Sequence, residues 1–152
     1  MEKLMYAIPF IGVAGLLFAL VLIARIKKQE PGNERMQEIS AAIHSGAKAF
    51  LFAEYKILVF FVLVLFIAIG FAISWPTAVS FVIGALFSVI AGYMGMNVAT
   101  KANVRTTNAA MKGGMKEALS VAFSGGAVMG MSVVGLGLVG LAVVLFLFPE
   151  QY

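Results

Sequence analysis

The sequence predicts an all-α protein, a polytopic membrane bundle of four transmembrane helices with both termini outside. Hydrophobic residues make up 62% of the 152 residues and charged residues only 12%, whereas a soluble domain is about half apolar and about a quarter charged. The mean hydropathy is +1.02. Because the charges lie between long apolar runs, we expect residues 1–152 to form a single membrane domain in the lipid bilayer.

Residues 4–24 form the first predicted span. They contain no charged residue, and their length matches the roughly 20 residues that a helix needs to cross the hydrocarbon core. The basic residues Arg25, Lys27 and Lys28 follow at once. A cleavable signal peptide has a shorter apolar region and a cleavage site of small residues, so we expect this span to be retained.

The second span is predicted at residues 57–73, at the end of a longer helical pattern. Pro31 to Asn33 form a turn signal, and apolar residues recur at helical spacing from Glu34 onward. One continuous helix from Glu34 to Ile73 would be about 60 Å long. A surface-lying amphipathic helix followed by a bend is an equally good interpretation of the same pattern.

Two further spans are predicted in the second half of the chain. A short turn containing Trp75 precedes the third span, residues 77–99, and the fourth span covers residues 118–148. The fourth exceeds the bilayer thickness, so we expect it to tilt or project. The polar and basic residues 100–117 lie between them and are expected to form a loop.

The basic residues predict the orientation of the spans. Lys3 stands alone before the first span, whereas six basic residues fall within 25–56 and four within 100–117. The positive-inside rule therefore places loops 25–56 and 100–117 in the cytoplasm and both termini outside. This topology accounts for the excess of 11 Lys+Arg over 7 Asp+Glu, so no nucleic-acid partner is expected.

Glycine is concentrated in the fourth span, where Gly126 and Gly130 form a small-xxx-small pair. Small residues let helix backbones approach closely in lipid, so we expect this span to have helical neighbours. Gly84, Gly92 and Gly95 give the third span a similar, weaker face. A phosphate-binding loop is not indicated, because no strand precedes the glycines and no Lys-Ser/Thr pair follows them.

No catalytic, substrate-binding or metal-ligating residue is predicted. Ion carriers and proton relays need an ionisable group inside the membrane, and the predicted spans contain none. The absence of Cys excludes thiolate metal sites and cysteine nucleophiles. His44 is solitary and is expected to be an ordinary exposed polar residue. We expect Asn97, at the cytoplasmic end of the third span, to pack or cap. All the acids lie in loops or at span ends: Glu2, Glu30, Glu34, Glu38, Glu54, Glu117 and Glu150.

Four basic residues share one predicted helical face in the second cytoplasmic loop. Lys101, Arg105, Lys112 and Lys116 project within about 60° of one another on a helix. Such a stripe contacts lipid headgroups and sets topology, or it attracts a phosphorylated anion; we expect the former. The Gly113-Gly114 pair is able to break this helix.

Three stretches occur together in a defined order: HSGAKAFLFAEYK at 44–56, AGYMGMNVATKANVRTTNAA at 91–110, and GGAVMGMSVVGLGLVGL at 125–141. In order and spacing they resemble the N-terminal portion of the membrane-bound inorganic pyrophosphatases. The resemblance implies a multi-pass cell-membrane pump that couples diphosphate hydrolysis to proton or sodium translocation, with magnesium as cofactor, as a homodimer.

The family's acidic magnesium-binding motifs have no counterpart in this sequence. We therefore expect an N-terminal portion that supplies scaffold helices only, is inactive in isolation, and has the remaining helices of the pump as partners. The alternative is a stand-alone, non-enzymatic four-helix membrane protein that associates through its Gly-rich faces.

Overall fold

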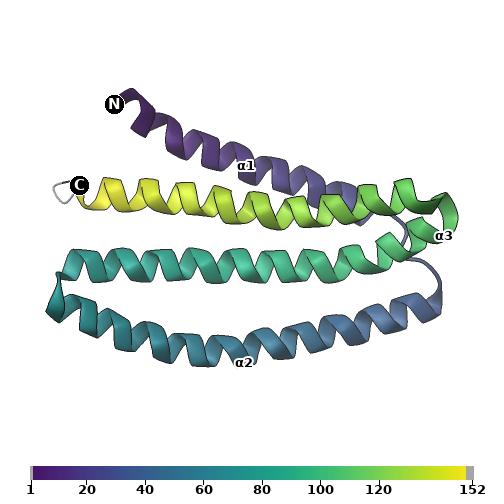
Figure 1. The fold of residues 1–152 in the computed structure, drawn as a ribbon, viewed down its shortest axis with the longest axis horizontal. Coiled ribbons are helices and arrows are strands. Elements are labelled where there is room, and N and C mark those ends of the chain that lie inside the picture. The colour runs from purple at the N-terminus through teal and green to yellow at the C-terminus, as the bar shows by residue number, and fades with distance from the viewer. Residues whose placement is uncertain (1, 150–152) are drawn as a thin grey trace.

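The protein is a bundle of long helices that lie side by side along one axis (Figure 1). The computed structural model describes residues 2–149, with side chains from residue 7 onward. Its elements are α1 (Glu2–Lys28), α2 (Glu34–Ala72) and α3 (Trp75–Leu147). The predicted all-α class is confirmed over this range. The Lys3 side chain and residues 150–152, which entered the predictions of topology and chain end, lie outside the described part.

α2 is one continuous helix, so the uninterrupted interpretation of the pattern after Glu34 is confirmed. Figure 1 shows the helix curving along its length without a break between a surface segment and a span. Its 39 residues correspond to about 58 Å. The helix begins where Asn33 caps it: the Asn33 Oδ1 accepts a hydrogen bond from the Met36 backbone N–H at 2.9 Å. The expected loop 25–56 is therefore mostly helical, and only residues 29–33 connect α1 to α2.

The prediction of four separate helices is corrected, because α3 contains both the third and the fourth predicted spans. Residues 100–117 are rich in good helix formers and stay helical. Gly114 alone has non-helical angles inside α3, φ 74° and ψ −164°. Figure 1 shows that α3 reverses direction at this end of the bundle. We call residues 75–113 the first arm and residues 115–147 the second arm.

The two arms of α3 pack against each other in antiparallel fashion. A Cβ added at Gly140 would lie 2.9 Å from the Phe87 ring, and one at Gly125 would lie 3.0 Å from the Ala102 Cβ. Each pair joins residues at similar distances before and after Gly114. The glycines therefore let the arms approach, which is the role expected of small residues between membrane helices.

The backbones of α1 and the second arm of α3 approach closely where Gly12 faces Gly135. A Cβ on Gly12 would lie 2.9 Å from the Gly135 carbonyl oxygen, and one on Gly135 would lie 2.9 Å from the Gly12 carbonyl oxygen. By contrast, added Cβ atoms at Gly126 and Gly130 would meet nothing within 4 Å. The predicted Gly126–Gly130 pair is thus not an internal contact. The core lies between α1 and both arms: Ala19, Leu22, Ile26, Val98, Ala102 and Val128.

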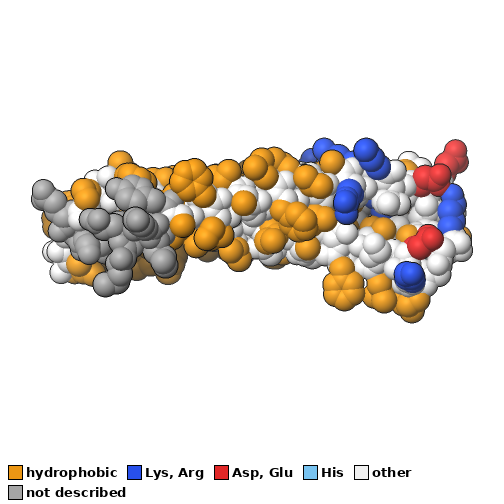
Figure 2. Space-filling view, turned by 90° about the horizontal axis from the view of Figure 1, so that it is seen from above, with side chains coloured by type: hydrophobic (Ala, Val, Ile, Leu, Met, Phe, Trp, Pro, Cys, Tyr) orange, Lys and Arg blue, Asp and Glu red, His pale blue; other side chains and the backbone are white. Residues whose placement is uncertain are grey.

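The outer surface is apolar over most of its length. All three helices contain stretches long and apolar enough to cross a membrane, and large side chains such as Phe10, Ile57 and Phe71 are 76%, 73% and 80% exposed. Figure 2 shows hydrophobic side chains along the bundle, with the visible basic and acidic side chains gathered toward one end. Such a surface is stable in lipid rather than in water. The orientation with both termini outside stays a prediction.

Candidate functional site

The side-chain hydrogen bonds and the ion pair between the most distant segments of the chain lie at the end where α1 passes into α2. We call this region the polar junction: residues 29–33, His44 of α2, and residues 100–112 of the first arm of α3. It holds side-chain hydrogen bonds between segments that are 56 to 82 residues apart. It overlaps two of the three stretches that carry the family resemblance.

The loop between α1 and α2 is fastened to the first arm of α3. The Arg105 Nε donates to the Gln29 carbonyl oxygen at 3.1 Å, and the Asn108 Nδ2 donates to the Glu30 carbonyl oxygen at 3.1 Å. Gly32, at φ 86°, supplies the left-handed backbone of the turn. The backbone carbonyl groups that follow the end of α1 thus accept hydrogen bonds from side chains of a neighbouring helix.

Lys112 continues the same face of α3 and forms an ion pair with the Glu30 carboxylate. The hydrogen bond from Lys112, together with its positive charge, lowers the pKa of the Glu30 carboxyl below its usual value. Both side chains are exposed, so the pair orients the loop more than it stabilises the fold.

The predicted basic stripe is therefore divided. Arg105 and Lys112 contact the loop between α1 and α2, whereas no hydrogen bond or ion pair joins the Lys101 or Lys116 side chain to the described residues of this loop. The break at Gly114 separates Lys116 from the other three, because the helical register does not continue through it.

We expect Lys112→Gln to lower the thermal unfolding temperature slightly at neutral pH. The Glu30 pKa is depressed in the folded state, so the contribution of the pair is present above the ordinary value of 4.5 and is lost as the pH falls through the lowered pKa. The difference between parent and variant should therefore disappear in acid, as measured by circular dichroism in detergent micelles.

Lys116→Gln is the matched control for this prediction, because it removes the same charge and Lys116 forms no ion pair among the described residues. An equal effect of the two substitutions at every pH would contradict a specific role of the pair.

His44 is half-buried and links α2 to α3, which corrects the expectation of an ordinary exposed residue. Its Nδ1 lies 2.9 Å from the Thr100 Oγ1. The Thr100 hydroxyl donates to the Met96 carbonyl oxygen at 3.0 Å, so it accepts from the His44 Nδ1–H. Thr100 is only 5% exposed. The sequence offered no local signal for this contact.

Asn108 is a buried contact residue of the junction that the sequence did not single out. It is 8% exposed, and its spacing from Arg105 and Lys112 on one helical face was the available signal. Asn97, in contrast, is half-buried. Its backbone carbonyl oxygen lies 3.2 Å from the Thr100 Oγ1.

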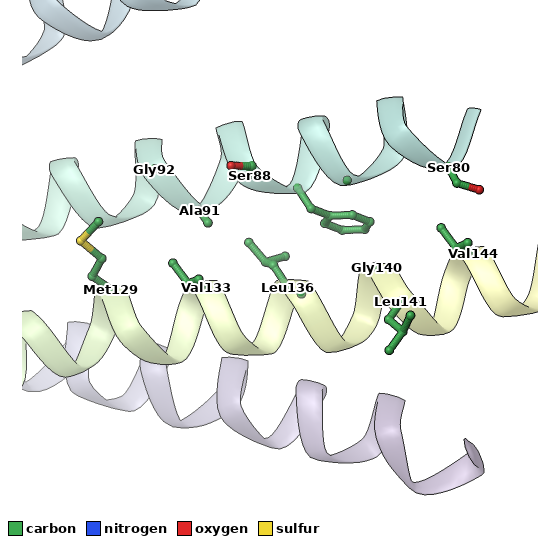
Figure 3. Close-up of a pocket in the computed structure, with 13 residues that line it drawn as sticks. Ser80, Ser88, Ala91, Gly92, Met129, Val133, Leu136, Gly140, Leu141 and Val144 are labelled. Carbon is green, nitrogen blue, oxygen red and sulfur yellow. The ribbon is translucent and has the colours of Figure 1, made fainter. Parts of the chain in front are cut away.

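A second feature, the arm groove, lies between the two arms of α3 in the apolar part of the bundle. It has a volume of about 610 Å³, and Figure 3 shows Val133 and Leu136 of the second arm pointing toward Ser88 and Ala91 of the first. The remaining lining residues are Ser80, Gly84, Phe87, Gly92, Met129, Gly137, Gly140, Leu141 and Val144. None is ionisable, so the groove offers a packing surface rather than acid–base chemistry.

The described residues do not fit a magnesium site. Mg²⁺ requires several oxygen ligands in near-octahedral geometry, and no group of three or more His, Cys, Asp or Glu is gathered in the described part of the chain. The carboxylates of Glu30 and Glu38 are instead engaged with Lys112 and Arg35. No step of chemistry can be assigned to magnesium held by these residues.

These features define a helical membrane protein whose longest-range side-chain hydrogen bonds lie at one end of an apolar bundle. The sequence profile of the family described as "Inorganic H+ pyrophosphatase" matches residues 13–152. The chain belongs to this family, which confirms the resemblance found in the sequence.

Curated relatives agree with this assignment. The chain is 52% identical over 148 residues, 97% of its length, to a "Putative K(+)-stimulated pyrophosphate-energized sodium pump" of Clostridium tetani, of which it covers 22%. It is 41% identical over 87% of its length to a "K(+)-insensitive pyrophosphate-energized proton pump" of Pyrobaculum aerophilum, of which it covers 19%. A "K(+)-stimulated pyrophosphate-energized sodium pump" of Thermotoga maritima is 40% identical over 95% of the chain, which covers 20% of it. The chain thus spans about a fifth of the length of these relatives.

Proposed function

We propose that this chain forms the N-terminal helices of a pump that couples diphosphate hydrolysis to proton or sodium translocation. Its relatives are named as pyrophosphate-energized pumps of both ions. In this proposal the chain supplies scaffold helices, and the catalytic and ion-conducting groups belong to the rest of the pump.

The observation that carries the scaffold role is the chemistry of the arm groove. It is lined by glycines and small or apolar side chains from both arms, with no ionisable group. An ion path through a membrane needs polar or charged groups, whereas close helix packing needs small residues. Gly84 and Gly137 in the groove have open space where a Cβ would stand, which suits the close approach of a further helix.

The remaining parts of the proposal concern the whole pump. The chain crosses the cell membrane several times, with its polar junction in the cytoplasm and both termini outside, as the distribution of basic residues favours. The pump is a homodimer, and its magnesium is held by residues outside this chain. A stand-alone four-helix protein is not favoured, because the relatives described above are pumps.

A chimera tests this proposal. Residues of this chain replace the matched segment of the Thermotoga maritima pump, with which the chain is 40% identical over 146 residues. We expect the chimera to retain magnesium-dependent diphosphate hydrolysis and diphosphate-driven sodium uptake in membrane vesicles. Membranes containing this chain alone should hydrolyse no more diphosphate than vesicles without it, because residues 7–149, whose side chains the structure describes, do not gather magnesium ligands.

Two outcomes would refute the proposal. Hydrolysis by the chain alone would show that it carries its own catalytic groups. A chimera that inserts into membranes at the level of the native pump but neither hydrolyses diphosphate nor transports sodium would show that these helices do not replace the pump's own.

A further inference from the structure

A polar pocket lies where the end of α1 meets the second arm of α3, and the proposed function does not use it. We call it the boundary pocket. Its volume is about 320 Å³. Arg25, Lys28 and Gln29 line it from the α1 side, and Ser120 and Ser124 line it from α3. It adjoins the polar junction and shares Gln29 with it, but its α3 wall comes from the second arm, whereas the contacts of the junction come from the first arm.

The floor of the boundary pocket is formed by buried side chains. Ile26 and Val121 line it and are only 3% and 7% exposed, and Ile26 belongs to the core between α1 and α3. Arg25 and Ile26 are adjacent in the last turn of α1, so the buried side chain holds the backbone that carries the basic wall. A pocket built on packed core residues keeps its shape without a ligand.

The chemistry of the walls suits a phosphate group. Arg25 and Lys28 carry two positive charges, and the Ser120 hydroxyl on the opposite wall can donate a hydrogen bond. The Ser124 hydroxyl donates to the Ser120 carbonyl oxygen at 2.7 Å. This hydrogen bond sets the orientation of the Ser124 hydroxyl on the α3 side of the pocket. No acidic residue lines the pocket.

The charges of the pocket are not cancelled by the acid that follows α1. The Glu30 carboxylate pairs with Lys112 in the polar junction, and it does not line the boundary pocket. The positive charge of Arg25 and Lys28 is therefore available to an anion.

The position of the pocket relative to the apolar runs favours a lipid headgroup over free phosphate as its ligand. Arg25 follows directly on the apolar run 4–24, and Ser120 stands near the start of the apolar run 118–148. One turn further into the apolar region, Val21 and Phe123 are 51% and 73% exposed. A phosphate bound here would lie at the edge of the bilayer. The exposed apolar side chains beside it would lie at the depth of the lipid acyl chains. Figure 2 shows basic side chains where the hydrophobic stretch ends.

We propose that the boundary pocket binds the phosphate of an anionic phospholipid. Arg25 and Lys28 neutralise the headgroup, Ser120 donates to a phosphate oxygen, and the acyl chains lie against Val21 and Phe123. This proposal is independent of diphosphate turnover, since none of these residues belongs to the arm groove or to the polar junction.

The test measures lipid binding to the purified 152-residue chain in detergent by native mass spectrometry. Phosphatidylglycerol is the anionic probe and phosphatidylcholine the zwitterionic one, and inorganic phosphate and diphosphate are added as competitors. We expect phosphatidylglycerol to be retained in preference to phosphatidylcholine. The double variant R25Q/K28Q should weaken phosphatidylglycerol binding about 30-fold, or about 2 kcal/mol.

The matched control is K27Q/K48Q, which removes the same two charges from exposed residues outside the pocket. It should leave binding within about twofold of the parent. R25K/K28R, which keeps both charges, should restore most of the affinity, and far-ultraviolet circular dichroism verifies that each variant is folded.

Three results would overturn the proposal. Equal weakening by R25Q/K28Q and K27Q/K48Q would indicate a diffuse surface charge. Equal retention of the two lipids by the parent would exclude an anionic headgroup site. Displacement of phosphatidylglycerol by inorganic phosphate or diphosphate at matched concentrations would indicate a site for free phosphate instead.

Discussion

Gly114→Ala should destabilise the protein by about 1–3 kcal/mol. Gly114 has φ 74° and ψ −164°, a combination that residues with a Cβ avoid. Relief of the strain requires the backbone to leave these angles, which would disturb the turn that sets the two arms of α3 antiparallel. The variant should therefore unfold at a lower denaturant concentration than the parent, as measured by chemical unfolding in mixed micelles with circular dichroism.

Gly113→Ala is the matched control for this prediction. Gly113 is helical, and the atoms nearest to an added Cβ belong to the end of the flexible Glu117 side chain, which can move away. Alanine also has the higher helix propensity, by about 1 kcal/mol. Gly113→Ala should thus be neutral or slightly stabilising, and equal destabilisation by the two substitutions would show that the angles at Gly114 do not matter.

Gly135→Ala is expected to cost about 1–3 kcal/mol, the usual range for overpacking. The new Cβ would lie 2.9 Å from the Gly12 carbonyl oxygen and 2.8 Å from the Leu16 Cγ. The Gly12 oxygen is backbone and cannot rotate away, so α1 must shift from the second arm of α3. The loss should appear as a lower unfolding midpoint in the same micelle assay.

Gly130→Ala tests whether this cost is specific to the contact with α1. Both glycines lie in the second arm, but an added Cβ at Gly130 meets nothing within 4 Å. Replacing an uncrowded helical glycine by alanine stabilises by about 0.5–1 kcal/mol. If Gly130→Ala destabilised this chain as strongly as Gly135→Ala, loss of glycine itself rather than the close approach to Gly12 would be the cause.

The helical content and the family could be read from the chain alone. The continuous helix from Glu34 was one of two equal interpretations, and the Asn33 cap with its Met36 contact is consistent with it. The family resemblance came from three stretches that the profile match at residues 13–152 includes. Local spacing and composition carry this information because helix formation depends on neighbouring residues.

The number of helical elements was predicted less well. The polar residues 100–117 had the composition of a loop, yet the break in α3 is confined to Gly114. Polarity indicates contact with water, but it does not by itself interrupt a helix whose residues have good helix propensity.

By itself, the sequence determined that this is an apolar helical protein with its charges outside the apolar runs, because lipid compatibility depends on composition and on the length of apolar runs. Tertiary structure alone decided which glycines are contacts, Gly135 rather than Gly126, and which polar residues meet. His44 reaches Thr100 across 56 residues, and Asn108 reaches Glu30 across 78. Such contacts depend on how each helix is rotated and shifted against its neighbours. The spacing of residues along one helix determines neither the rotation nor the shift.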